Sequence, residues 1–122
     1  MQKQIMIAAA LSLFSVGAYA QGADIGGRYD AQGTNIDGSP YKGTAEIVVT
    51  TTTTCRITWR TGSSSVQQGI CMRNGNTLSA AYTFANGKPG LIIYEMQRDG
   101  SMKGLWTIAD QKGVGTENLT PR

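Results

Sequence analysis

The chain contains no histidine among its 122 residues. An imidazole is the general base of Ser-His-Asp and Cys-His catalysis, and it is one of the usual ligands of zinc. The missing histidine therefore excludes both catalytic arrangements and every metal site built on this residue.

Clusters of basic residues are missing too. The chain has eleven Lys and Arg against eight Asp and Glu, and its basic residues are scattered singly. Proteins that bind nucleic acid carry basic runs or patches. We therefore expect no nucleic acid among the partners of this protein.

Long apolar runs are absent beyond the first twenty residues. Residues 5–16 form such a run after a short basic start with Lys3, and Ala18-Tyr19-Ala20 has the small residues of a signal-peptidase site. The run is too short to span a bilayer, which needs about 20 apolar residues. We interpret residues 1–20 as a secretory signal peptide. We expect a single exported domain, residues 21–122, periplasmic or secreted, with no membrane span.

The chain has only two cysteines, which in an exported protein predict one disulfide because exported thiols are oxidised. Cys55 and Cys71 lie equally far in sequence from Ser63, in a Gly/Ser-rich stretch between two strand-like runs. A hairpin centred on Ser63 places the two cysteines opposite each other, where their Cα atoms are about 4.5 Å apart and a disulfide fits. In the absence of a β-bulge, this register turns Ile70 and Met72 away from the hairpin's apolar face.

No helical period follows residue 20. Turn signals recur about every 8–12 residues between runs rich in Thr, Val, Ile and Tyr, as in an all-β sandwich or barrel. The sixth run begins nearly all apolar, which indicates burial on both faces. The pattern predicts eight strands, at about residues 25–31, 41–50, the stretch from a turn near 51–52 to 60, 66–73, 77–85, 91–98, 102–109 and 114–120.

Tight turns between these strands favour antiparallel pairing of sequence neighbours. Eight such strands avoid exposed edges by closing into an up-and-down meander barrel, whose interior is filled by side chains or holds one small ligand. Inward glycines at Gly27, Gly43, Gly104 and Gly115 permit the coiling that a small barrel needs. A sandwich of two four-stranded sheets is the alternative.

Several short motifs stand out along residues 21–122. They are Gly27-Arg28-Tyr29, the stretch 33–43, Ile57-Thr58-Trp59, Gly69-Ile70-Cys71-Met72, Tyr94, Asp99-Gly100, Gly104-Leu105-Trp106-Thr107 and Gly115-Thr116-Glu117. With these motifs the chain resembles a family of small exported bacterial β-barrel proteins, mostly uncharacterised, some of them labelled fibronectin-binding. The resemblance covers nearly all of residues 21–122, and it implies a calycin-like or avidin-like barrel without catalytic residues.

Aromatic side chains on the inward faces are candidates for a ligand site. Trp59, Trp106 and Tyr94 are the first choice, with Tyr29, Tyr41 and Tyr82 in the same set. Aromatic walls with few polar groups are typical of small-molecule sites. The alternative is that these rings simply fill the core of a small barrel.

Glu117 is the acidic candidate, because alternation places it on the inward face with Leu119. An unpaired buried charge is costly, so an inward carboxylate needs a partner. A structural ion pair with Arg28, Arg56 or Arg60 is one interpretation. A carboxylate that anchors a ligand is the other.

The remaining acids favour structural roles. Four of them lie in or beside turns, where Asp bonds to the local backbone: Asp30, Asp37, Asp99 and Asp110. A paired-carboxylate glycosidase is the enzymatic alternative. Residues 35–39 resemble part of a calcium loop but lack its closing Glu, so turn chemistry is preferred. We expect no catalytic residue, no metal and no cofactor.

The pattern as a whole favours a monomeric, non-enzymatic binding protein. Its partner is a small ligand or an extracytoplasmic protein, held by the barrel mouth or by the loops. The alternative is an inhibitor of an extracytoplasmic enzyme such as a secreted protease, with residues 21–25 entering the active site of the target.

Overall fold

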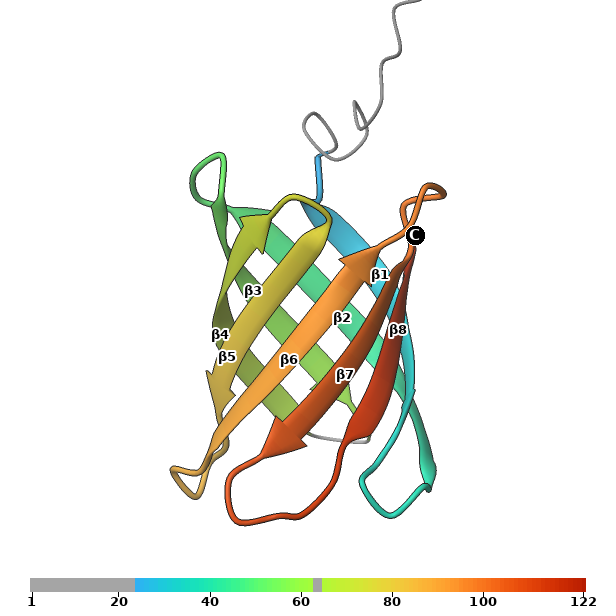
Figure 1. Ribbon diagram of the computed structural model, residues 1–122, viewed down its shortest axis with the longest axis vertical. Helices are drawn as coiled ribbons and strands as arrows, with labels where there is room; N and C mark the ends of the chain where they lie inside the picture. Colours follow the sequence, from blue (N-terminus) through green and yellow to red (C-terminus); the bar gives the residue numbers. More distant parts are fainter. Residues whose placement is uncertain (1–23, 63–64) are drawn as a thin grey trace, which may run out of the picture.

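The computed structural model describes residues 24–62 and 65–122, which form a closed barrel of eight strands (Figure 1). Each strand pairs antiparallel with its neighbour in sequence, and the last strand pairs with the first. The predicted meander barrel is therefore confirmed, and the sandwich is wrong. The described residues contain no helix of the length and apolarity that crossing a bilayer requires. The expected signal peptide lies outside the described residues.

The strands follow the predicted ones closely, except at the end of the first. It continues through Gly33 and Thr34, which the sequence pattern assigned to a loop, because both residues pair with the second strand and with the last. The strands are β1 (Gly27–Thr34), β2 (Pro40–Val49), β3 (Thr54–Thr61), β4 (Ser65–Asn74), β5 (Thr77–Thr83), β6 (Pro89–Met96), β7 (Met102–Ile108) and β8 (Gly115–Pro121).

The two ends of the barrel differ in what they carry. The connections after β1, β3, β5 and β7 lie at one end, which we call the mouth (bottom of Figure 1). The connections after β2, β4 and β6 lie at the opposite end, together with the start of β1 and the C-terminus (top of Figure 1). We call this second end the disulfide end.

The disulfide joins directly opposed residues of β3 and β4, as the register predicts. Cys55 pairs with Cys71 in the ladder, and their Cα atoms are 4.9 Å apart. No bulge intervenes, so Ile70 and Met72 point outward and are 71% and 61% exposed. Both cysteines are buried in the core.

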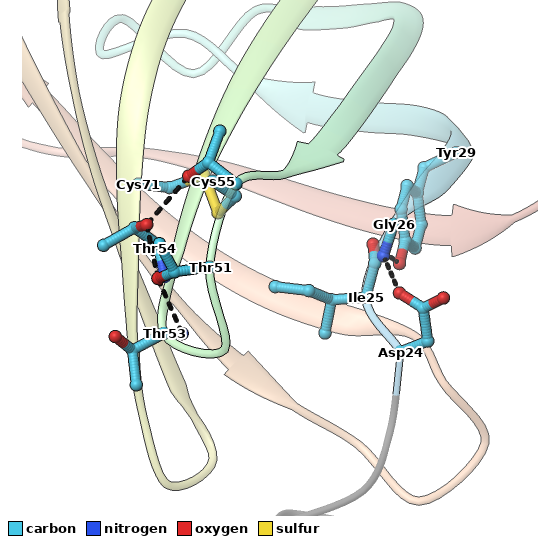
Figure 2. Close-up of a disulfide and its surroundings, with 10 residues drawn as sticks. Asp24, Ile25, Gly26, Tyr29, Thr51, Thr53, Thr54, Cys55 and Cys71 are labelled. Carbon is cyan, nitrogen blue, oxygen red and sulfur yellow. Dashed lines mark hydrogen bonds between the residues drawn. A yellow bond between two sulfur atoms is a disulfide. The ribbon is translucent and has the colours of Figure 1, made fainter.

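Several local hydrogen bonds lie at the disulfide end of the barrel (Figure 2). Ile25 is buried, and its carbonyl accepts a hydrogen bond of 2.7 Å from the hydroxyl of Tyr29. In the predicted threonine turn between β2 and β3, the Thr51 hydroxyl accepts bonds from the backbone N–H groups of Thr53 and Thr54. Side-chain hydroxyls thus hold a turn that has no Gly or Pro.

The outer surface of β4 to β7 is partly apolar. Leu91 and Ile93 of β6 are 47% and 48% exposed, so the expectation that β6 is buried on both faces is wrong. Its inward residues Ile92 and Tyr94 are buried, which makes β6 an ordinary barrel strand with an unusually apolar outer face.

Candidate ligand-binding site

A cavity of about 330 Å³ opens in the mouth half of the barrel. This volume lies at the lower end of the range for small-molecule sites, roughly 300–1,000 Å³. Five aromatic side chains contribute to its wall: Tyr41, Trp59, Tyr82, Phe84 and Trp106.

The rings form two groups on different strands. Trp59 of β3 contacts Tyr82 of β5 edge-on, with ring centroids 5.1 Å apart, and Tyr82 contacts Phe84 in the same way at 5.4 Å. Tyr41 of β2 and Trp106 of β7 make a third edge contact at 6.3 Å. Such edge contacts hold aromatic rings in fixed orientations, so the walls of the cavity are preorganised.

Glycines on the neighbouring strands make room for these rings. Gly90 lies opposite Tyr82 in the ladder, and Gly115 lies opposite Trp106. A Cβ on Gly90 would come within 2.3 Å of the Tyr82 ring, and one on Gly115 within 2.2 Å of the Trp106 indole. Gly90 and Gly115 therefore make room for aromatic side chains, whereas a Cβ on Gly43 would meet the backbone oxygen of Arg60 at 2.1 Å. Gly27 is different, because its φ is +133° and a Cβ there would meet nothing within 4 Å.

Glu117 is the second inward-facing residue of β8, counted from the mouth end, and it contributes to the cavity wall. It is 3% exposed and is the only buried charged side chain among the described residues. Its Oε1 accepts a hydrogen bond of 3.0 Å from the Tyr41 hydroxyl. Its Oε2 accepts bonds from the Tyr94 hydroxyl and from Trp59 Nε1, the latter at 3.0 Å.

The predicted ion pair for Glu117 is wrong. Arg28 lies on the outer surface, where it bonds to Glu46 at 3.2 Å, and Arg56 and Arg60 are also exposed on the outside. Alternation along the strands turns these arginines away from the interior. Two phenols and an indole take their place as partners of the carboxylate.

The buried carboxylate and its tyrosines perturb one another's protonation. Burial raises the pKa of Glu117 above its ordinary value, and the hydrogen bonds from Tyr94, Tyr41 and Trp59 offset part of that effect. Burial and the nearby Glu117 raise the pKa values of Tyr41 and Tyr94 well above the ordinary value, and that of Tyr82 to about 12. The phenols around Glu117 are therefore neutral hydrogen-bond donors at physiological pH.

The structure brings three of the four predicted ligand residues into one hydrogen-bond network, Trp59, Tyr94 and Glu117. Trp59, Trp106 and Glu117 line the cavity. Tyr94 is fully buried and lies behind them, where its hydroxyl accepts a 2.9 Å bond from Trp59 Nε1 and donates to Glu117. Of the other tyrosines, Tyr29 lies near the disulfide end and takes no part.

Sequence analysis missed Phe84 and the polar residues of the cavity wall. Phe84 shares the inward parity of Tyr82, and this signal was available in the sequence. The polar residues near the mouth carry no aromatic or charged group that would distinguish them: Asn35, Thr61, Ser65 and Gln67.

Residues 35–39, which resemble part of a calcium loop, form a turn, as predicted from the sequence. Ser39 donates to the Asp37 carboxylate through its N–H at 2.9 Å and through its hydroxyl at 2.6 Å. Asp99 and Ser101 repeat the arrangement between β6 and β7 with the same distances. Among residues 24–62 and 65–122, no three His, Cys, Asp or Glu side chains come together as a metal site would require.

Comparison with known proteins shows a shared fold. Neither a protein-family model nor a curated protein sequence matches the chain. The chain is similar to the solved structure of EF1p2_mFAP2b bound to DFHBI, with a TM-score of 0.74 and 16% identity over 86% of this chain and 100% of that one.

Two further solved structures agree. A redesigned β-barrel, mFAP1, bound to DFHBI, has a TM-score of 0.68 at 17% identity, over 80% of this chain and 94% of its own. A de novo designed fluorescence-activating β-barrel has a TM-score of 0.60 at 15% identity, over 80% of this chain and 93% of its own. At these identities the likeness concerns the fold alone; two of the three barrels are bound to DFHBI.

Proposed function

We propose that this protein is an exported, non-enzymatic binding protein that holds one small ring-containing ligand in the mouth half of its barrel. The observation that carries the proposal is a cavity of about 330 Å³ with aromatic walls and a single buried carboxylate. Aromatic walls that surround a few polar groups are the usual composition of such sites.

Two further points support binding rather than catalysis or enzyme inhibition. Glu117 has no second buried carboxylate beside it among the described residues, so a paired-acid mechanism lacks its partner. An inhibitory N-terminal segment is not favoured, because Ile25 is buried at the disulfide end; residues 21–23 lie outside the described chain. Export rests on the signal-peptide pattern of residues 1–20.

The test uses the protein's own fluorescence, because both of its tryptophans line the cavity. Titration with 2-phenylethanol, a neutral single-ring probe, should change the tryptophan emission saturably with one-site stoichiometry. At about 0.5 kcal/mol per heavy atom, nine heavy atoms correspond to a Kd of roughly 0.5 mM.

Two neighbouring glutamines provide a matched control. Gln67 lines the cavity, whereas Gln68 lies next to it on β4 and is exposed on the outer face. Gln67→Phe should fill the cavity and weaken binding of the probe at least about tenfold, while Gln68→Phe should leave it unchanged. Equal binding by both variants, or no binding by the wild type, contradicts the proposal.

A further inference from the structure

We infer that the cavity selects a protonated organic amine attached to a ring, with Glu117 as its counter-ion. This inference rests on the proposed ligand-binding function and assigns the chemical class of the ligand. It follows from the charge of the cavity, from a count of the protons available to Glu117, and from the chemistry of the walls.

The cavity contains a carboxylate but no basic side chain to balance its negative charge. Among its lining residues Glu117 is the only carboxylic acid, and no Lys or Arg is present. The ion pairs that the structure shows lie on the outer surface between exposed side chains, such as Arg122 with Asp30. A buried carboxylate without a cation pays a desolvation cost that a bound cation would offset.

The protein supplies too few protons to saturate the carboxylate. Trp59 Nε1 has one hydrogen, which it shares between the Tyr94 hydroxyl at 2.9 Å and Glu117 Oε2 at 3.0 Å. The Tyr41 hydroxyl also has one hydrogen, with two acceptors in reach: Glu117 Oε1 at 3.0 Å and the Thr116 carbonyl at 3.1 Å.

An ionised carboxylate has about four acceptor positions. Oε2 receives the Tyr94 proton and shares that of Trp59, while Oε1 has only the divided proton of Tyr41. Tyr41 and Glu117 both line the cavity, and Oε1 is the carboxylate oxygen with fewer donors. It has acceptor capacity left for the N–H group of a ligand.

The walls suit a cation as well. Four electron-rich rings line the cavity, in two contacting pairs: Trp59 with Tyr82, and Trp106 with Tyr41. Aromatic faces attract ammonium groups, more strongly when the pair is desolvated, and they pack equally well on the ring of the ligand. An anionic ligand would meet Glu117 without any positive group to compensate.

Three probes of nearly equal size test the charge preference: 2-phenylethylammonium, 2-phenylethanol and phenylacetate. Their affinities at pH 7 are measured by calorimetry or by tryptophan fluorescence. The ammonium probe should bind at least about tenfold more tightly than the alcohol, which also donates a hydrogen bond but has no charge. Phenylacetate should bind most weakly.

Glu117→Gln should reduce the ammonium preference to about threefold or less, while leaving the alcohol bound. Glu46→Gln is the control, since it removes the same charge from an exposed position on β2 and should preserve the preference. If wild type binds the alcohol and the ammonium equally, ligand binding stands and the inference about charge fails. If no probe binds, the proposed function itself fails.

A pH titration of the wild type gives a result that needs no variant. The ammonium probe keeps its charge between pH 4 and 8, and the neighbouring Tyr41, Tyr82 and Tyr94 stay neutral there. Its advantage over the alcohol should therefore fall as pH decreases and Glu117 takes up a proton. A preference that is constant across this range would overturn the assignment of Glu117 as the counter-ion.

Discussion

Glycine and aromatic residues face each other in pairs inside this barrel, and each pair acts as one unit. Gly104 of β7 lies opposite Tyr94 of β6, and a Cβ on Gly104 would come within 2.6 Å of the Tyr94 ring and 2.9 Å of the Glu117 carbonyl oxygen. Because Tyr94 is fully buried, its ring has little room to move aside. The absence of one side chain thus fixes the position of another, and with it a hydroxyl that bonds to Glu117.

Gly104→Ala should lower the free energy of unfolding by about 1–3 kcal/mol, the usual cost of overpacking a core. Denaturant titration measures this change. Paired with Tyr94→Leu in a double-mutant cycle, the same substitution should cost less, because the smaller side chain relieves the contact. An identical cost in both backgrounds would show that the contact with Tyr94 is not the cause.

Strands and their register were largely predictable from the sequence. Cys55 and Cys71 lie symmetrically about the hairpin turn, so their pairing followed from arithmetic alone. Alternation placed Trp59, Trp106 and Glu117 inside, because a side chain's face depends only on its position along its own strand.

The partners of Glu117 were not predictable in this way. Tyr41 stands on β2 and Glu117 on β8, with β1 between them. Their contact depends on how the closed sheet is staggered and on Gly33, which lies between both: it pairs with Tyr41 on one side and with Glu117 on the other. Neither property shows in the alternation of a single strand, and the arginines were assigned to Glu117 only because of their charge.

The β3–β4 hairpin has a covalent link that should matter for stability. The disulfide closes a loop with a sequence separation of 16. In the chain-entropy treatment, such a loop contributes roughly 3 kcal/mol by restricting the unfolded chain. The double substitution Cys55→Ala/Cys71→Ala should therefore lower Tm by more than about 10 °C in a domain of this size.

Thermal unfolding followed by circular dichroism measures this change, and reductant added to the wild type is the independent comparison. The strand signal below the transition should stay the same, since the ladder pairs β3 and β4 along their whole length. An unchanged Tm in both experiments would mean that the disulfide contributes nothing to stability.

The pH dependence of the stability of the whole molecule should show the effect of one buried acid, Glu117. The pKa of Glu117 is raised in the folded state, so the folded protein holds this proton more tightly than the unfolded chain does. Protonated Glu117 therefore adds to the free energy of unfolding. This contribution is fully present below its ordinary pKa of 4.5 and is lost as pH rises through its raised pKa in the folded protein. Asp37 and Asp99 have the opposite effect on the pH dependence of stability, because hydrogen bonds from Ser39 and Ser101 lower their pKa values.

Comparison with Glu117→Gln isolates the effect of this acid, since the variant keeps every other titrating group. Without ligand, the unfolding free energy of the wild type minus that of the variant should decrease from pH 4 toward neutral pH. Denaturant titrations at several pH values provide the measurement. A difference that increases with pH would mean that the folded protein favours the ionised form, and that burial is not the dominant effect at Glu117.

The disulfide end also holds residue 24 and Arg122, on the opposite side of the barrel from the mouth (Figure 1). A surface, a tag or a second protein joined through either of these positions would therefore leave the aromatic cavity facing open solution. The barrel is suited to immobilisation on a sensor chip or to display on a cell through either of these two residues. In both formats the two tryptophans would still report what enters the mouth.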